Sequence, residues 1–159
     1  MIRSTSRFAA LVACAALVAA ACNQLPTRKG NTVESPANSK IETASPVDVA
    51  VLPIVNATGS KKVPSKELRE ALEAGLVQRR YTPLATEFVD AQVTDAAFRP
   101  GSLREDATLQ VTIGNWDDSL WATHTAVTLE LTARIVDSRT GAELWSGKLD
   151  RRFDLGKDR

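Results

Sequence analysis

Few residues of this sequence have the types and spacing that catalysis requires. The folded part contains one histidine, His124, and no cysteine, because both cysteines precede residue 23. A nucleophilic pair would therefore need a serine or threonine beside His124, and a single histidine in a polar stretch is more often a surface residue. Asp117 and Asp118 are adjacent, so their carboxyl groups point to different sides of a strand or turn and do not share a substrate. The sequence predicts no catalytic residue.

Patterns that could bind a ligand are incomplete. Asn56, Thr58 and Gly59 stand between an apolar run and an amphipathic one, where phosphate can bind, but the spaced glycines of a phosphate loop are missing, which favours a simple turn. Without cysteine or a second histidine, the common zinc sites are excluded, and the carboxylates lack calcium-loop spacing. We expect no metal and no cofactor. A net charge of +1 gives no electrostatic basis for binding nucleic acid.

Cys22 is the residue with the clearest chemistry. Two arginines at positions 3 and 7 and an apolar run at residues 8–21 precede it, which is typical of a signal peptide. As a helix this run reaches about 21 Å, less than the roughly 30 Å of a bilayer core. The small residues before Cys22 resemble a lipobox, in which the cysteine is acylated before cleavage, although Ala19 stands where leucine is usual. We predict a lipoprotein signal peptide at residues 1–22.

Two alternatives to acylation at Cys22 exist. Residues 11–14 match the lipobox better by letter, but cleavage before Cys14 would leave only residues 8–13 as the apolar segment, which is shorter than about 7 residues. An ordinary secretory signal would leave Cys22 as a free thiol.

Two or three acyl chains, such as palmitate, would anchor the protein firmly, whereas one chain binds only marginally. Asn23, where an aspartate would favour the inner membrane, predicts the outer membrane with the domain facing the periplasm.

The elements that follow indicate one domain. Residues 23–46 are polar and contain three prolines, which predicts a disordered linker, and residues 47–155 form a single α+β domain. The apolar and periodic runs predict the order β-α-β-(α)-β-β-β, a small mixed sheet with helices on one side that ends in an antiparallel meander. The expected elements are a buried strand at 47–54, a helix at 66–80 capped by Ser65, an edge strand at 81–84, a helix or structured loop at 87–97, and strands near 108–113, 127–135 and 142–153.

Alternation fixes which side chains of the longest predicted strand face the core. Leu129, Leu131 and Ile135 are expected to face inward, while the polar residues between them, Thr128, Glu130 and Arg134, face solvent. Residues 115–123 are expected to form the connection before this strand. Trp116 and Trp121, two of the three tryptophans, lie in it. They either form a partner or self-association surface or simply cover the end of the core.

Four segments together carry a family resemblance. These are residues 49–56, 81–84 and 103–109 and, most specifically, the hairpin 135–147 with its aspartate, Thr-Gly turn and Leu-Trp pair. They resemble the bacterial lipoprotein families whose folded part is similar to the curli secretion-channel lipoprotein and the TolB amino-terminal domain. The long amphipathic hairpins of the curli channel are missing here, so we do not expect a pore.

The resemblance implies an envelope protein that assembles with partners rather than an enzyme. We therefore expect a non-enzymatic accessory or scaffold subunit of an envelope secretion, transport or wall-synthesis assembly, with the membrane as lipid partner and an envelope protein or further copies of this chain as protein partner. The alternative is a periplasmic small-ligand binder or hydrolase.

Overall fold

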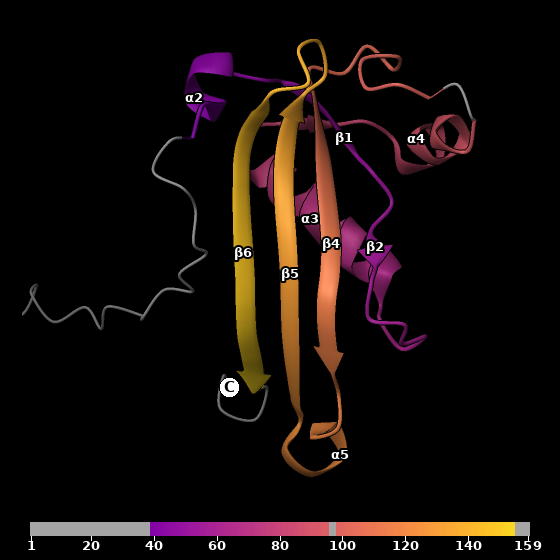
Figure 1. Ribbon diagram of the computed structural model, residues 1–159, viewed down its shortest axis with the longest axis vertical. Coiled ribbons are helices and arrows are strands. Elements are labelled where there is room, and N and C mark those ends of the chain that lie inside the picture. The colour runs from indigo at the N-terminus through magenta and orange to yellow at the C-terminus, as the bar shows by residue number, and fades with distance from the viewer. Residues whose placement is uncertain (1–38, 96–97, 155–159) are drawn as a thin grey trace, which may run out of the picture. The chain divides into compact units, whose positions relative to one another are not determined.

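The computed structural model describes residues 39–95 and 98–154, which form one mixed α+β unit (Figure 1). Residues 1–38, including Cys22, lie outside the described residues. The strands are β1 (Asp48–Val51), β2 (Val55–Asn56), β3 (Thr82–Pro83), β4 (Ala107–Asp117), β5 (Ala126–Asp137) and β6 (Glu143–Asp154). The helices are α2 (Ile41–Ala44), α3 (Ser65–Gln78), α4 (Thr86–Val93) and α5 (Trp121–His124).

All six strands belong to one sheet, in which β3, β1, β4, β5 and β6 are neighbours in that order and β2 pairs with β4. The pairings of β1 with β3 and β4 are parallel, whereas β4, β5 and β6 form an antiparallel meander. The predicted α+β fold with a mixed sheet and a carboxyl-terminal meander is therefore confirmed. Pro83 lies on the edge strand β3, where a missing backbone donor is tolerated.

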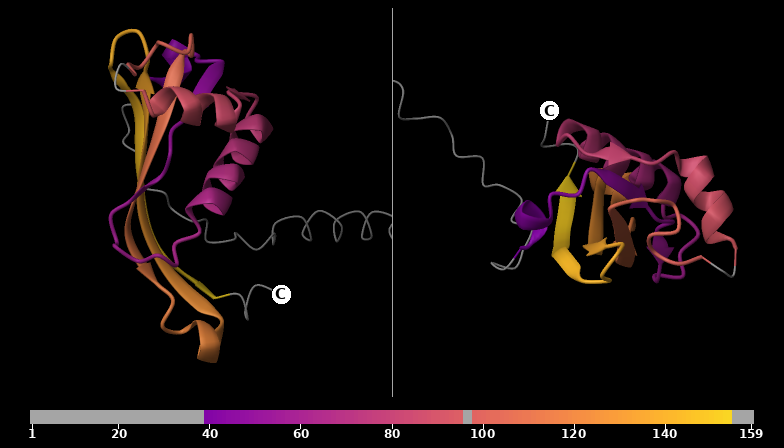
Figure 2. Two further views of the ribbon diagram at one scale, coloured as in Figure 1. Left: turned by 90° about the vertical axis from the view of Figure 1, so that its right-hand side faces the viewer. Right: turned by 90° about the horizontal axis from the view of Figure 1, so that it is seen from above.

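Two apolar clusters lie on opposite faces of β1. Val49 and Val51 pack with Leu76 of α3, which lies across one face of the sheet (Figure 2). Ala50, whose side chain points the other way, packs with Val89 of α4 and with Leu103. The strand predicted to be central is thus buried on both faces, because each face has its own cover.

The long helix differs from its prediction at both ends. Ser65 is its first helical residue rather than its cap, since Pro64 occupies the N-cap position and no side chain caps the helix. Proline suits a helix start because the N–H groups of the first turn have no partner within the helix. The helix ends at Gln78, two residues before the predicted end. The segment 87–97, for which we predicted a helix or a structured loop, contains most of α4.

Residues 39–46, the last part of the predicted disordered linker, have defined structure. The Lys40 amide donates to the Leu144 carbonyl at 2.8 Å, and Ile41 packs against the main core cluster. One apolar side chain therefore attaches this polar segment to the edge of β6. Among the described residues, no helix is long and apolar enough to cross a membrane.

The tight hairpin between β5 and β6 forms at the predicted turn. Asp137 Oδ1 accepts hydrogen bonds from the amides of Arg139 and Thr140 and from the Thr140 hydroxyl. These bonds, from Thr140 above all, hold the pKa of Asp137 below its ordinary value. Gly141 has φ +71°, a conformation that glycine adopts without strain.

The first prediction concerns the face assignment of β5. Leu131 packs against the main core cluster, whereas its neighbour Thr132 is exposed. Because Leu131 is only partly buried, Leu131→Ala should lower the free energy of unfolding by about 2 to 3 kcal/mol, near the lower end of the usual range, and Thr132→Ala by less than about 1 kcal/mol. Urea unfolding measures both, and equal losses for the two variants would contradict the assignment.

Candidate interaction surface on the long sheet

The meander β4–β5–β6 has one apolar and one polar face. Residues paired across antiparallel strands point to the same face. A bulge between Ile113 and Asn115 shifts the alternation of β4 by one residue, so that Trp116 joins Ile113 on the apolar face. The rungs of the apolar face that lie farthest from the β5–β6 turn are Ile113–Leu131–Leu149, Trp116–Leu129–Arg151 and Val127–Phe153. The opposite face carries Gln110–Arg134–Ser146, Thr112–Thr132–Lys148, Asn115–Glu130–Asp150 and Asp117–Thr128–Arg152.

The strands of this meander are longer than the helix that covers them. β5 has 12 residues and spans about 40 Å, whereas α3 has 14 residues and is about 21 Å long. Figure 2 shows that α3 lies over only part of the sheet and that the strands continue well past its end. The end that carries α5, here called the distal end, is therefore not covered by α3.

The uncovered apolar side chains form what we call the distal apolar patch, made of Trp116, Val127, Leu149 and Phe153. All four are only half-buried, and Leu129 is buried among their rungs. Arg151 lies with its guanidinium 5.2 Å from the Phe153 ring centre, which is a cation–π distance. The Trp116 Nε1 atom is buried without an acceptor among the described residues. A buried indole N–H normally has one, so this donor is an exception to the usual pairing of buried polar groups.

The two tryptophans singled out in the sequence lie on different elements. The predicted connection 115–123 is shorter than expected, because β4 continues to Asp117 and places Trp116 on a strand opposite Leu129. Trp121 begins the short helix α5 and is 49% exposed. Trp116 thus lies on the apolar face of the distal sheet, whereas Trp121 is an exposed aromatic residue on α5.

The residues considered for acid–base chemistry do not converge. His124 is exposed, and its Nδ1 lies 2.8 Å from the Thr123 hydroxyl. Asp117 accepts from the Ser119 amide, and hydrogen bonds from the Ser119 side chain and backbone hold the Asp117 pKa below its ordinary value. Asp118 instead pairs with Lys62 at 3.0 Å. The two neighbouring carboxylates therefore have separate structural partners.

The segment considered for phosphate binding forms a turn that satisfies its own polar groups. Asn56 Oδ1 accepts from the Thr58 amide and hydroxyl, and Asn56 Nδ2 donates to the Ser60 carbonyl at 2.7 Å. The sequence analysis predicted a simple turn here because the spaced glycines of a phosphate loop are missing, and this turn is confirmed. Among residues 39–95 and 98–154, no three His, Cys, Asp or Glu side chains are grouped as a metal site requires.

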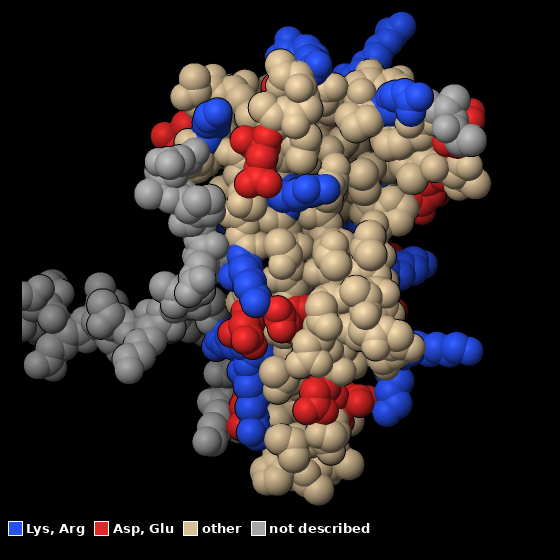
Figure 3. All heavy atoms as spheres, in the orientation of Figure 1, with Lys and Arg blue, Asp and Glu red and all other residues tan. Residues whose placement is uncertain are grey.

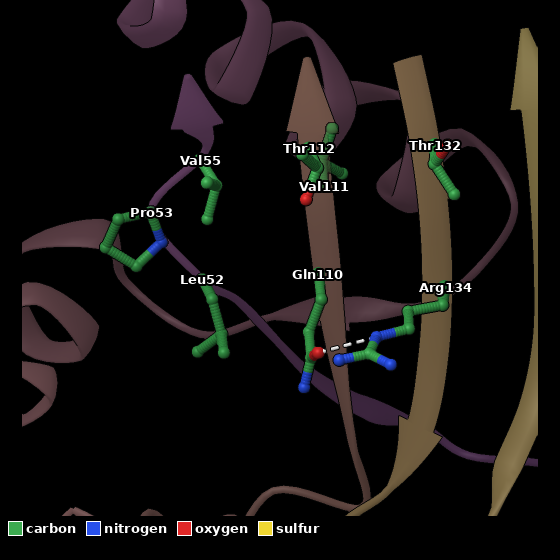
Figure 4. Close-up of a pocket in the computed structure, with 8 residues that line it drawn as sticks. All are labelled: Leu52, Pro53, Val55, Gln110, Val111, Thr112, Thr132 and Arg134. Atoms are coloured by element: carbon green, nitrogen blue, oxygen red, sulfur yellow. Dashed lines mark hydrogen bonds between the residues drawn. The ribbon is translucent and has the colours of Figure 1, made fainter. Parts of the chain in front are cut away.

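A shallow groove of about 450 Å³ lies on the polar face, where the β1–β2 segment departs from β4 (Figure 4). Leu52, Pro53 and Val55 form its apolar side. Across from them, Arg134 Nε donates to Gln110 Oε1 at 2.8 Å, which orients the guanidinium. The groove is lined by no carboxylate or histidine, so its described residues can bind a polar group but supply no general acid or base.

The sequence analysis missed one buried charged residue, Arg69. Its guanidinium donates twice to the Val51 carbonyl at the end of β1 and to Asp90 of α4 at 2.6 Å, with Glu73 at 3.7 Å. It thereby joins α3, β1 and α4. A signal was present, because Arg69 stands three and seven residues before Leu72 and Leu76 and so shares their core-facing side of the helix.

A second missed residue, Glu105, fixes the opposite end of the sheet from α5. Its carboxylate is 3% exposed and accepts from the amides of Gly101 and Leu103 and from the Ser138 hydroxyl. These bonds hold the loop before β4 against the β5–β6 turn. The sheet is therefore firmly tied at one end, while its distal end has no comparable polar network in the part of the chain that the structure describes.

Comparisons with known proteins identify the fold. No protein-family model matches the chain, and no curated protein matches it significantly. Among solved structures, lipoprotein GNA1162 from Neisseria meningitidis is similar with a TM-score of 0.58 and 26% identity, over 72% of this chain and 88% of that one. The fold is thus one that a bacterial lipoprotein adopts, in agreement with the resemblance seen in the sequence.

Two further structures share this fold at lower identity. A PelC dodecamer from Paraburkholderia phytofirmans matches with a TM-score of 0.56 and 18% identity, over 77% of this chain and 82% of that one. LpoB from E. coli matches with a TM-score of 0.50 and 15% identity, over 71% of this chain and 65% of that one.

The second prediction concerns Arg69. Arg69→Met should lower the free energy of unfolding by about 2 to 4 kcal/mol, because it leaves the Val51 carbonyl buried without a donor and frees α4. Lys66→Met on the same helix is the matched control, since the Lys66–Glu70 pair is exposed and 3.9 Å long. It should change stability by less than about 0.5 kcal/mol. Urea unfolding of both variants tests this, and similar effects would show that the Arg69 network is not needed.

Proposed function

We propose that this protein is a cell-envelope lipoprotein, anchored through Cys22, whose domain is a non-enzymatic accessory or scaffold subunit. The observation that carries the proposal is the distal apolar patch. The strands of the meander run past the end of α3, so α3 leaves this patch uncovered. Apolar surface that the fold leaves uncovered marks contact sites for other molecules. The exposed Trp121, together with Trp116, whose N–H has no acceptor among the described residues, adds the residue type that contributes most at protein interfaces.

The likeness to other proteins supports the same role. Lipoprotein GNA1162 shares the fold, and the PelC structure is a dodecamer, so the fold is compatible with both a lipid anchor and self-assembly. We infer an outer-membrane anchor with the domain in the periplasm. A protein partner in the envelope, or further copies of the chain, would then cover the distal patch.

A second candidate function rests on the groove of the polar face. Arg134, oriented by Gln110, could hold an anionic or polar small ligand against Leu52 and Val55. We favour the scaffold role, because the groove is open and Arg134 is exposed, whereas small-molecule sites bury most of their ligand.

The third prediction tests the anchor. Cys22→Ser should move most of the protein from the membrane fraction to the soluble periplasmic fraction, because acylation of the thiol is lost. Cys14→Ser is the control and should leave the protein in the membrane fraction. A Cys22→Ser protein that remains membrane-bound and is cut at the same rate would contradict lipidation at this residue.

The fourth prediction tests the surface. Trp121→Ala should abolish crosslinks to envelope partners while changing the melting temperature little, since the ring is half exposed. Val77→Ala is the matched control, because Val77 is 58% exposed on α3 and outside the patch, and it should retain the crosslinks. Trp116→Phe removes the indole N–H and should weaken crosslinking in a protein that stays folded. If all three variants crosslink as the parent does, the two tryptophans do not form an interface.

A further inference from the structure

The distal apolar patch lies on the same face of the sheet as α3, beyond the part that this helix covers (Figure 2). Leu131, whose rung includes Leu149 of the patch, packs against the cluster that α3 covers. The loop before α3 reaches the end of β4, where Lys62 pairs with Asp118 at 3.0 Å. The short helix α5, which begins with the exposed Trp121, lies at the far end of the strands. The patch is therefore a floor with α3 and its loop on one side and α5 at the end.

This floor has the dimensions of one helix. Strands of about 40 Å under a helix of about 21 Å leave about 20 Å of the meander uncovered. The two outer strands of the meander are about 10 Å apart, which matches the diameter of one α-helix. An apolar sheet face is stable when it packs against a helix or a second sheet, and α3 already covers the other part of this face. A helix of about 13 residues would fill the remaining area.

One charged side chain, that of Arg151, lies among the rungs of the patch. It is opposite Leu129 on β5, and its guanidinium lies 5.2 Å from the Phe153 ring centre without an ion pair to any described residue. Asp118 at the end of β4 is already paired with Lys62. The opposite face of the same strands differs, because acidic and basic side chains are intermixed there (Figure 3). A molecule that covers the patch also covers Arg151, and a cation without a partner is costly to bury.

The cover must therefore be apolar and carry a carboxylate. A second copy of the patch supplies apolar side chains but no carboxylate, since its one charged rung residue is another Arg151. A flat bilayer surface meets α3 first, because α3 stands about 10 Å above the sheet on the same side. A helix from another protein fits beside α3 and can present an apolar stripe together with an acidic side chain.

We propose that the distal apolar patch binds one amphipathic helix of about 13 residues from another envelope protein, with an acidic residue in the middle of its apolar stripe. The stripe, at i, i+3, i+4 and i+7 spacing, covers Val127, Leu149 and Phe153. The acidic residue pairs with Arg151 and selects this helix over other amphipathic helices. This inference deepens the proposed function and rests on it, since it names the kind of partner that the scaffold subunit holds.

Synthetic helical peptides test the chemistry of the patch. The probe has leucines at helical spacing along one face, one glutamate in the middle of that face, alanine and glutamine elsewhere, and a covalent staple, because short helices unfold in water. A second peptide has lysine in place of the glutamate. The protein is the full-length Cys22→Ser chain, which needs no detergent that would cover the patch. Fluorescence anisotropy of labelled peptides measures binding, and the acidic peptide should bind about tenfold or more tightly than the basic one.

Two adjacent arginines on opposite faces of β6 provide the variant and its control. Arg151→Glu should reverse the preference, so that the lysine peptide binds more tightly than the glutamate peptide. Arg152→Glu makes the same charge change on the polar face and should leave the preference as in the parent. Melting temperatures show that both variants stay folded. Equal binding of the two peptides to the parent, no binding of either, or the same effect of both substitutions would overturn the proposal.

These measurements can fail independently of the proposed function. Membrane release by Cys22→Ser and loss of envelope crosslinks in Trp121→Ala do not depend on a docked helix. A protein that passes those tests but binds neither peptide remains an envelope scaffold whose patch has another cover. A protein that fails them but selects the acidic peptide through Arg151 keeps the docking site and loses its envelope role.

Photocrosslinking in the native envelope tests which molecule covers the patch. A photoreactive phenylalanine at Leu149 of the lipidated chain should crosslink to a segment of another protein that has an apolar stripe with an acidic residue, as mass spectrometry identifies it. The same probe at Thr132, exposed on the polar face, is the control and should not capture this segment. Arg151→Glu should abolish the crosslink, and lysine in place of the acidic residue of the captured segment should restore it. Capture of a second copy, of residues 23–38 or 155–159, of lipid, or of nothing would overturn the proposal.

Discussion

The difference in length between the strands and their covering helix determines the rest of this structure. Three strands of 11 or 12 residues share an apolar face, and the 14-residue α3 can cover only about half of it. The fold therefore buries its core at one end and leaves half-buried aromatic and aliphatic side chains at the other. A surface of this kind is costly to expose to water, which explains why we place the interaction site there.

The polar interactions of the fold are concentrated at the opposite end. Arg69 ties α3 and α4 to the end of β1, and Glu105 ties the loop before β4 to the β5–β6 turn. Buried charges of this kind are retained where their hydrogen bonds are complete, and they specify one arrangement of the elements they join. The distal strands extend from this fixed base, so their position relative to the helices is defined without any cover of their own.

Local pattern explains which parts of the fold were predictable. The strands of the meander follow from strict alternation, and their turn follows from Asp137, Thr140 and Gly141, because these effects act between near neighbours in sequence. Arg69 was missed because its role depends on the carbonyl of Val51. The short edge strand β3 leaves this carbonyl without a backbone donor. The extension of β4 through Trp116 was missed because Gly114 and a bulge interrupt the alternation there. The distal patch could not be predicted, since it arises from the relative lengths of elements and not from any one segment.

Hydrogen exchange of the anchored protein in native membranes tests most directly whether the distal sheet is a contact surface. The account predicts that amides of β6 after Ser146 and of β4 near Trp116 exchange much more slowly in membranes than in the isolated Cys22→Ser protein at low concentration. Amides of β1, which are buried in both forms, should exchange equally and serve as the internal reference. Equal exchange of the distal amides in the two preparations would contradict the account, because the patch would then remain uncovered where the protein works.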